Sequence, residues 1–152
     1  MLDGTPVAIY NGNMLLTIEK VIILRSAEAF ASMPDHVLAY IASIVEEVDV
    51  PRGETFIHKG DIGNCMYLIV DGRVRVHDGD RTIAEFEKGQ PVGELAVLDP
   101  EPRSASVTAL EDTHLFKLDK EAFDEVMADQ PEIAHGVIRI LCRRLRLSAD
   151  RI

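Results

Sequence analysis

Residues suited to binding an anion lie close together in the second half of the chain. Gly93 permits a tight backbone bend, and residues 94–98 favour a single helical turn whose free N–H groups can face an anion. Arg103 follows a link from Pro100 to Pro102 that cannot continue a helix, so its guanidinium can fold back and grip a phosphate through paired hydrogen bonds. Glu94 at the rim suits a sugar hydroxyl better than a bare phosphate. The pattern therefore indicates a ligand with both an anion and a ribose.

The elements that must position this stretch show two different periods. Between about Val48 and Leu118 apolar residues alternate and turn residues recur, which predicts short antiparallel strands. Apolar residues at helical spacing precede this region and follow it, and Gln130 and Pro131 interrupt the second helical region. The order predicts an α+β fold, an antiparallel β jelly-roll barrel of about eight strands with a short N-terminal helical segment and two C-terminal helices. The clearest predicted strands are residues 55–57, 66–70, 74–77, 82–86, 105–110 and 114–118.

Composition and charge exclude several classes of protein. The 152 residues include 26 acidic and 16 basic side chains, a formal charge of −10, which disfavours a nucleic-acid partner because such binding relies on basic groups. Aliphatic runs are too short for direct membrane insertion, and the first residues do not read as a signal peptide. Cys65 and Cys142 form no CxxC pair and are predicted to be small buried thiols. We therefore expect a cytoplasmic protein.

The anion-binding stretch resembles the phosphate-binding cassette of the cyclic nucleotide-binding domain family, which occurs in catabolite activator proteins, kinase regulatory subunits and gated channels. The matching residues are Gly93, Glu94, Leu95, Ala96 and Val97, then Arg103, Ser104 and Ala105 after a five-residue link. A second family signature lies upstream, with Gly60, Asp61, Ile62 and Gly63 followed by residues 66–69 and Gly72. One small departure is Phe56, where a smaller aliphatic residue is usual. The resemblance covers roughly residues 22–147.

The resemblance implies a cyclic mononucleotide ligand, cyclic AMP, with cyclic GMP as an alternative because Ser104 suits either base. Glu94 would accept the ribose 2′-hydroxyl, Arg103 would pair with a phosphate oxygen, and the amides of Leu95 and Ala96 would complete the anion site. The implied ligand-binding residues are Gly93, Glu94, Leu95, Ala96, Arg103, Ser104 and Ala105. Gly60, Gly63 and Gly72 are interpreted as turn formers of the scaffold.

In this family a C-terminal helix closes over the base as a lid, which here implies the helix of residues 133–147. Candidate base contacts are Val74, Val76 and Phe86 in the barrel and Ile138, Leu141, Cys142 and Leu145 in the lid. The expected organisation is a loose lead-in over residues 1–16 and a binding domain over 17–152. That domain divides into a helical segment at 17–47, a β-roll at 48–118, and hinge and lid helices at 119–152, with the hinge at Gln130 and Pro131. Lid movement would relay binding to an effector protein.

Other functions fit the sequence less well. His58, His77 and His114 stand 19 and 37 positions apart without the close pair of a cupin metal site, so we expect no metal. No nucleophile and base accompany the cassette, so we expect no enzyme. A ligand-free docking domain and a truncated transcription regulator stay open, the latter needing a helix-turn-helix that this chain lacks. The arginine-rich C-terminal helix is a possible contact face for a homodimer or an effector domain.

Overall fold

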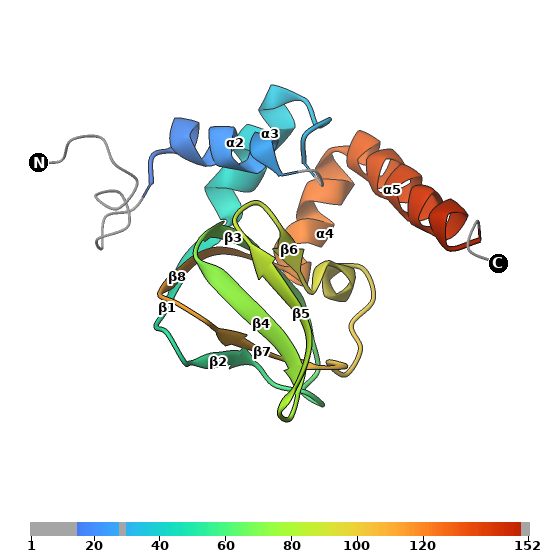
Figure 1. The fold of residues 1–152 in the computed structure, drawn as a ribbon. Helices are drawn as coiled ribbons and strands as arrows, with labels where there is room; N and C mark the ends of the chain where they lie inside the picture. Colours follow the sequence, from blue (N-terminus) through green and yellow to red (C-terminus); the bar gives the residue numbers. More distant parts are fainter. Residues whose placement is uncertain (1–14, 28–29, 150–152) are drawn as a thin grey trace, which may run out of the picture.

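The computed structural model describes residues 15–27 and 30–149, and this part of the chain forms a β-roll with helices at one end (Figure 1). Helices α2 (Thr17–Ser26) and α3 (Asp35–Ile44) come first, and α4 (Lys120–Asp129) and α5 (Pro131–Ala149) come last. The strands between them are β1 (Glu46–Val50), β2 (Thr55–Ile57), β3 (Cys65–Asp71), β4 (Arg73–Asp78), β5 (Arg81–Glu87), β6 (Pro91–Val92), β7 (Ser106–Ala109) and β8 (Thr113–Asp119). A short 3-10 helix, η1 (Glu94–Val97), follows β6.

The predicted antiparallel jelly roll is confirmed for the described residues. One four-stranded sheet has the order β1-β8-β3-β6, and the other has the order β2-β7-β4-β5. Within these two sheets, each pair of neighbouring strands is antiparallel. The two-residue strand β6 was not predicted individually, because it is too short to show an alternating pattern.

Strand β3 lies at the centre of the molecule, and its two faces belong to two separate apolar clusters. Cys65, Tyr67 and Ile69 face the interior of the β-roll, with Val74 of β4 and Leu115 of β8. The alternate residues Met66, Leu68 and Val70 belong to the cluster that contains Leu38 and Ile41 of α3, Val126 of α4 and Phe116 of β8. Burial on both faces explains why residues 65–70 are apolar without interruption.

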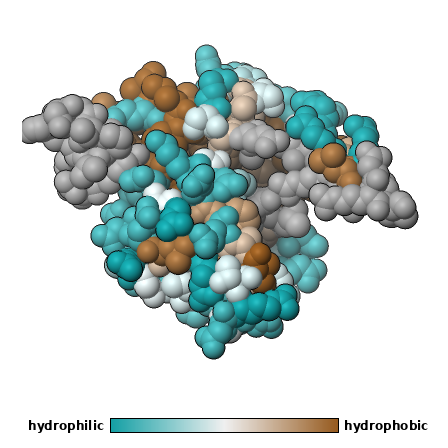
Figure 2. Space-filling model, viewed as in Figure 1, coloured by the Kyte–Doolittle hydropathy of each residue, from teal (hydrophilic) through white to brown (hydrophobic). Residues whose placement is uncertain are grey.

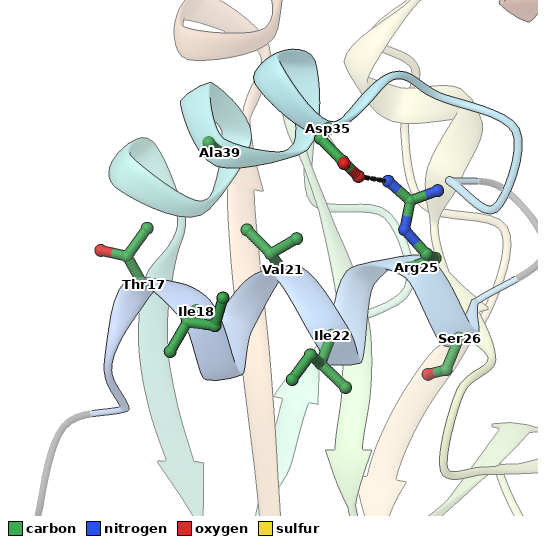
Figure 3. A pocket seen from close by; sticks show the side chains of 8 residues that line it. All are labelled: Thr17, Ile18, Val21, Ile22, Arg25, Ser26, Asp35 and Ala39. Carbon is green, nitrogen blue, oxygen red and sulfur yellow. Dashed lines mark hydrogen bonds and ion pairs between the residues drawn. The ribbon is translucent and has the colours of Figure 1, made fainter.

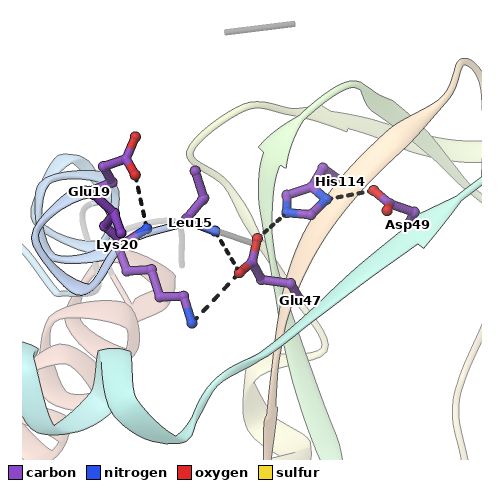
Figure 4. Close-up of polar contacts among 7 residues, drawn as sticks. Leu15, Glu19, Lys20, Glu47, Asp49 and His114 are labelled. Atoms are coloured by element: carbon purple, nitrogen blue, oxygen red, sulfur yellow. Dashed lines mark hydrogen bonds and ion pairs between the residues drawn. The ribbon is translucent and has the colours of Figure 1, made fainter. Parts of the chain in front are cut away.

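A buried polar network joins helix α2 to the sheet (Figure 4). Glu47 of β1 accepts hydrogen bonds from the Leu15 backbone N–H at 3.0 Å and from His114 Nε2 at 2.8 Å, and Lys20 Nζ lies 3.7 Å away. Leu15 is only 5% exposed, so packing begins inside the lead-in predicted over residues 1–16. The rest of that segment, residues 1–14, lies outside the described residues. Packing begins at Leu15 because its backbone N–H donates a hydrogen bond to the Glu47 carboxylate, which fixes the chain there.

The predicted break between the last two helices is present. Helix α4 ends at Asp129, Gln130 is its cap, and α5 begins at Pro131. Helix α3 contacts this junction, with His36 Nε2 3.2 Å from Gln130 Oε1 and the Tyr40 hydroxyl donating to Asp129 at 3.1 Å. That hydrogen bond to Asp129 raises the pKa of Tyr40. Among the described helices, none is both long and apolar enough to cross a bilayer.

Candidate functional site

The backbone around Arg103 is held by the upstream loop of residues 60–65. Arg103 N–H donates to the Asp61 carbonyl at 2.7 Å, and its own carbonyl accepts from Gly60 N–H at 2.8 Å. Gly63 N–H donates to the Glu101 carbonyl at 2.9 Å. These bonds join the upstream glycine-containing signature to the cassette, although some 40 positions separate them. Arg103 therefore has a fixed position relative to β3.

The guanidinium of Arg103 is half-buried and lies beside the start of β3. Its Nη2 donates to the Cys65 carbonyl at 2.7 Å and lies 3.6 Å from the Cys65 sulfur. Among the described side chains, no carboxylate forms an ion pair with Arg103. A guanidinium has five N–H donors in a planar fork, so most of its donors remain for a bound anion.

Gly93 is needed here for two reasons. Its φ of +71° is a left-handed conformation that favours glycine, and a Cβ atom at this position would overlap Arg103 Nη1. The 3-10 helix η1 follows directly, with Ala96 N–H donating to the Gly93 carbonyl at 3.1 Å. The Ala96 amide, which the resemblance assigns to the anion, is thus already engaged, and a ligand would have to share it.

A pocket of about 560 Å³ lies against Arg103. Its described lining is Gly93, Ala96, Leu98, Asp99, Glu101, Pro102, Arg103, Ser104 and Leu141. Arg103 is the only cation in that lining, and Leu141 reaches the pocket from α5. The described lining therefore combines one cation, the carboxylates of Asp99 and Glu101, a hydroxyl from Ser104 and apolar side chains. It is formed by the cassette and the last helix together.

Comparison with known proteins agrees with this geometry. The family model described as cyclic nucleotide-binding domain matches residues 47–130. The chain belongs to this family. The CRP-like cAMP-activated global transcriptional regulator of Mycobacterium tuberculosis is 32% identical over 135 residues, which cover 86% of this chain and 60% of that protein.

Two further proteins contain a region similar to this cyclic nucleotide-binding domain. The N-terminal domain of a transcriptional regulator from Streptomyces coelicolor superposes with a TM-score of 0.79 at 32% identity, covering 86% of this chain and 94% of that one. The lysophospholipase nte1 of Aspergillus niger is 31% identical over 129 residues, which are 82% of this chain and 8% of that protein. The chain thus spans 60% or less of the length of these curated relatives.

The cyclic nucleotide-binding domain brings several of the predicted ligand-binding residues together. Gly93, Ala96, Arg103 and Ser104 line the pocket. Ala105 is half-buried just before β7 and does not line it. The side chains of Glu94 and Leu95 lie outside the described residues, so the predicted ribose contact stays a prediction.

The candidate base contacts occupy different environments. Val74 is fully buried in the core between the sheets, and Val76 and Phe86 pack beside it, half-buried. Among the described side chains of α5, Leu141 alone lines the pocket. The other candidates from α5 are the half-buried Cys142, Ile138, which is 56% exposed, and Leu145, which is 70% exposed. Leu141 is therefore the lid candidate that the geometry favours.

Sequence reasoning missed the part that β3 plays in the site. The Cys65 carbonyl holds Arg103, but a backbone carbonyl leaves no signal in the sequence. Tyr67 lies two residues further along, with its ring edge-on to Phe56 at 5.1 Å, so the unusual Phe56 fills space beside Tyr67. Burial raises the pKa of the Tyr67 phenol, and the Cys65 thiol raises it further, so the phenol stays protonated.

A larger groove of about 800 Å³ lies between α2 and α3 (Figure 3). Its walls include Ile18, Val21 and Ile22, and Figure 2 shows hydrophobic side chains gathered over this end of the molecule. Its one described cation, Arg25, is paired with Asp35. The cation of this groove therefore has a carboxylate partner, whereas no described carboxylate forms an ion pair with Arg103. Within the described residues, no group of three or more His, Cys, Asp or Glu side chains could hold a metal ion.

Proposed function

We propose that this domain is a regulatory module that binds cyclic AMP as a signal in the pocket at Arg103, with cyclic GMP as the alternative ligand. One observation carries the proposal. A half-buried guanidinium lines a pocket and has no carboxylate partner among the described side chains. An unneutralised charge in a partly desolvated place is costly, and a singly charged phosphate would remove that cost.

The arrangement suits the parts of a cyclic nucleotide. Arg103 would donate to the exocyclic phosphate oxygens, and Ser104 would add a hydroxyl beside them. Glu94 would accept the ribose 2′-hydroxyl, as the resemblance implies. Leu141, which lines the pocket from α5, would cover the base. Binding, and not catalysis, is the role that these residues support.

The relay that we propose runs through the last helix. Leu141 touches the pocket and belongs to α5, which joins α4 at Gln130, so closure of Leu141 over a base would move α5 about that junction. A ligand shifts such an equilibrium only by its differential affinity for the two arrangements. A preference of about 10 to 100-fold would supply roughly 1.4 to 2.7 kcal/mol of coupling. His36 and Tyr40 of α3 would sense the movement at the same junction.

We propose that the activity regulated by this module belongs to a separate effector domain or protein. One relative is named as a transcriptional regulator and another as a lysophospholipase, and each is longer than the matched region. That difference supports a module that can be joined to unrelated effectors in the cytoplasm, through α5 or as a homodimer. The proposal assigns no nucleic-acid contact and no membrane insertion to the residues described.

Calorimetric titration tests the proposal. The protein would first be freed of carried-over ligand by unfolding and refolding, and then titrated with cyclic AMP, cyclic GMP and 5′-AMP. We expect saturable heat with one site per chain, tightest for cyclic AMP and weakest for 5′-AMP, which lacks the phosphate ring. The absence of both heat and thermal stabilisation with either cyclic nucleotide would contradict the proposal and support a ligand-free docking domain.

A further inference from the structure

The upstream loop of residues 60–65 contains glycines in two different backbone conformations. Gly60 has a φ of +93°, so its turn favours glycine for conformational reasons. Gly63 does not have a positive φ, so no left-handed backbone conformation calls for glycine at this position. The interpretation of Gly63 as a turn former therefore does not explain why this position lacks a side chain.

The absence of a side chain at Gly63 is explained by the lack of space beside Arg103. A Cβ atom at Gly63 would overlap Arg103 Nε and would lie 2.6 Å from Arg103 Cζ and 2.8 Å from Cδ. The stem and guanidinium of Arg103 therefore lie directly over the backbone of Gly63, and even a methyl group would push them away. A Cβ atom at Gly93 would likewise overlap Nη1 of the same guanidinium.

We infer that Gly63 is a positioning residue for the anion site, an inference that rests on the proposed function. Gly63 supplies the surface against which the Arg103 side chain lies, and the same loop holds the arginine at both ends. Its backbone bonds fix the Arg103 main chain, and the Cys65 carbonyl fixes Nη2 at 2.7 Å. The guanidinium is thus oriented before the ligand arrives, which lowers the ordering cost of binding.

The variant Gly63→Ala tests this role. Because the clash is with the far end of a flexible side chain, we expect the protein to stay folded while Arg103 moves. Affinity for cyclic AMP should fall about tenfold or more, the scale for loss of a hydrogen bond to a charged group. Gly136→Ala in α5 is the matched control, because a Cβ there meets nothing closer than Arg139 Nη2 at 3.9 Å. The control should bind like the parent protein.

A double mutant separates positioning from a merely structural effect. In the Arg103→Ala background the methyl group has room, so adding Gly63→Ala should cause no further loss of affinity and no loss of thermal stability. Equal losses from Gly63→Ala in both backgrounds would overturn the inference.

A readout without nucleotide separates this inference from the proposed function. The ¹⁵N–¹H resonance of Arg103 Nε, assigned by its loss in Arg103→Ala, should shift in Gly63→Ala and stay in place in Gly136→Ala. An unchanged resonance in Gly63→Ala would overturn the positioning role, whether or not the parent protein binds cyclic AMP. A shifted resonance in a protein that binds no cyclic nucleotide would support the positioning role and refute only the proposed ligand.

Discussion

Arg103 and His114 are both basic side chains of the β-roll, but their surroundings differ. His114 is 6% exposed, with Nε2 2.8 Å from Glu47 and Nδ1 2.6 Å from Asp49 (Figure 4). Both ring nitrogens of His114 therefore lie within hydrogen-bond distance of a carboxylate of the same chain. Arg103 has a backbone carbonyl and no carboxylate among the described side chains. We therefore interpret His114 as part of the scaffold, and Arg103, which has no carboxylate partner among the described side chains, as part of the proposed ligand site.

The largest expected effect comes from Glu47→Ala, which breaks the buried polar network around Glu47. It would leave His114 and Lys20 without their shared buried carboxylate and the Leu15 N–H without an acceptor. We expect unfolding free energy to fall by about 3 kcal/mol, measured by urea denaturation, with ligand affinity unchanged in the folded protein. Glu85→Ala, which breaks the exposed pair with Arg73, should cost less than about 1 kcal/mol. Equal losses for the two variants would refute the structural role of this network.

Arg103→Ala should have the opposite effect, weakening ligand binding while leaving the free energy of unfolding almost unchanged. Removing the guanidinium would take away the proposed main contact for phosphate, so the binding free energy for cyclic AMP should weaken by about 1.5 to 3 kcal/mol in calorimetric titration. Stability should change little, because no buried carboxylate among the described side chains loses its partner. Arg75→Ala, whose guanidinium bonds to Thr82 on the β-roll, is the matched control and should keep full affinity. A destabilised Arg103→Ala protein with parental affinity would contradict the contrast between Arg103 and His114.

Leu141→Ala tests whether α5 contributes to ligand binding in the pocket beside Arg103. Truncating an apolar side chain that covers part of a ligand should weaken binding by about 1 kcal/mol. Leu145→Ala is the matched control on the same helix, because Leu145 is 70% exposed and does not line the pocket. Dissociation constants for both variants give the comparison, and a greater loss in Leu145→Ala would assign the lid to the other residue.

The smallest expected effect concerns the carboxylates of Asp99 and Glu101, which line the pocket. In the double variant Asp99→Asn, Glu101→Gln, less repulsion should tighten anion binding about two to threefold at low salt. High salt should abolish that gain, because exposed charges are screened within about 10 Å. Asp80→Asn, in the turn between β4 and β5, should leave affinity unchanged at either salt concentration. A gain that persists at high salt would point to a cause other than charge.

The sequence was sufficient for the features that depend on neighbouring residues. Alternation and turn residues predicted most strands, and Gln130 with Pro131 predicted the break before α5. Arg103 and Gly93 were found because the cassette is a local motif, and both line the pocket. Strand β6 was too short to show a period.

Contacts between distant residues could not be predicted in the same way. The Glu47 and His114 pair depends on the register between β1 and β8, across 67 positions. Gly63 and Arg103 meet only because backbone bonds join their loops, and an absent side chain shows its purpose only when its neighbour is known. The Cys65 carbonyl carries no sequence signal at all. These features became visible only in three dimensions.

A crystal structure of the protein with cyclic AMP tests the central claim most directly. We expect the cyclic phosphate in the pocket, with an oxygen within about 3 Å of the Arg103 guanidinium and the Cys65 carbonyl contact retained. A nucleotide bound in the groove between α2 and α3, or an Arg103 side chain turned away from the phosphate, would contradict it.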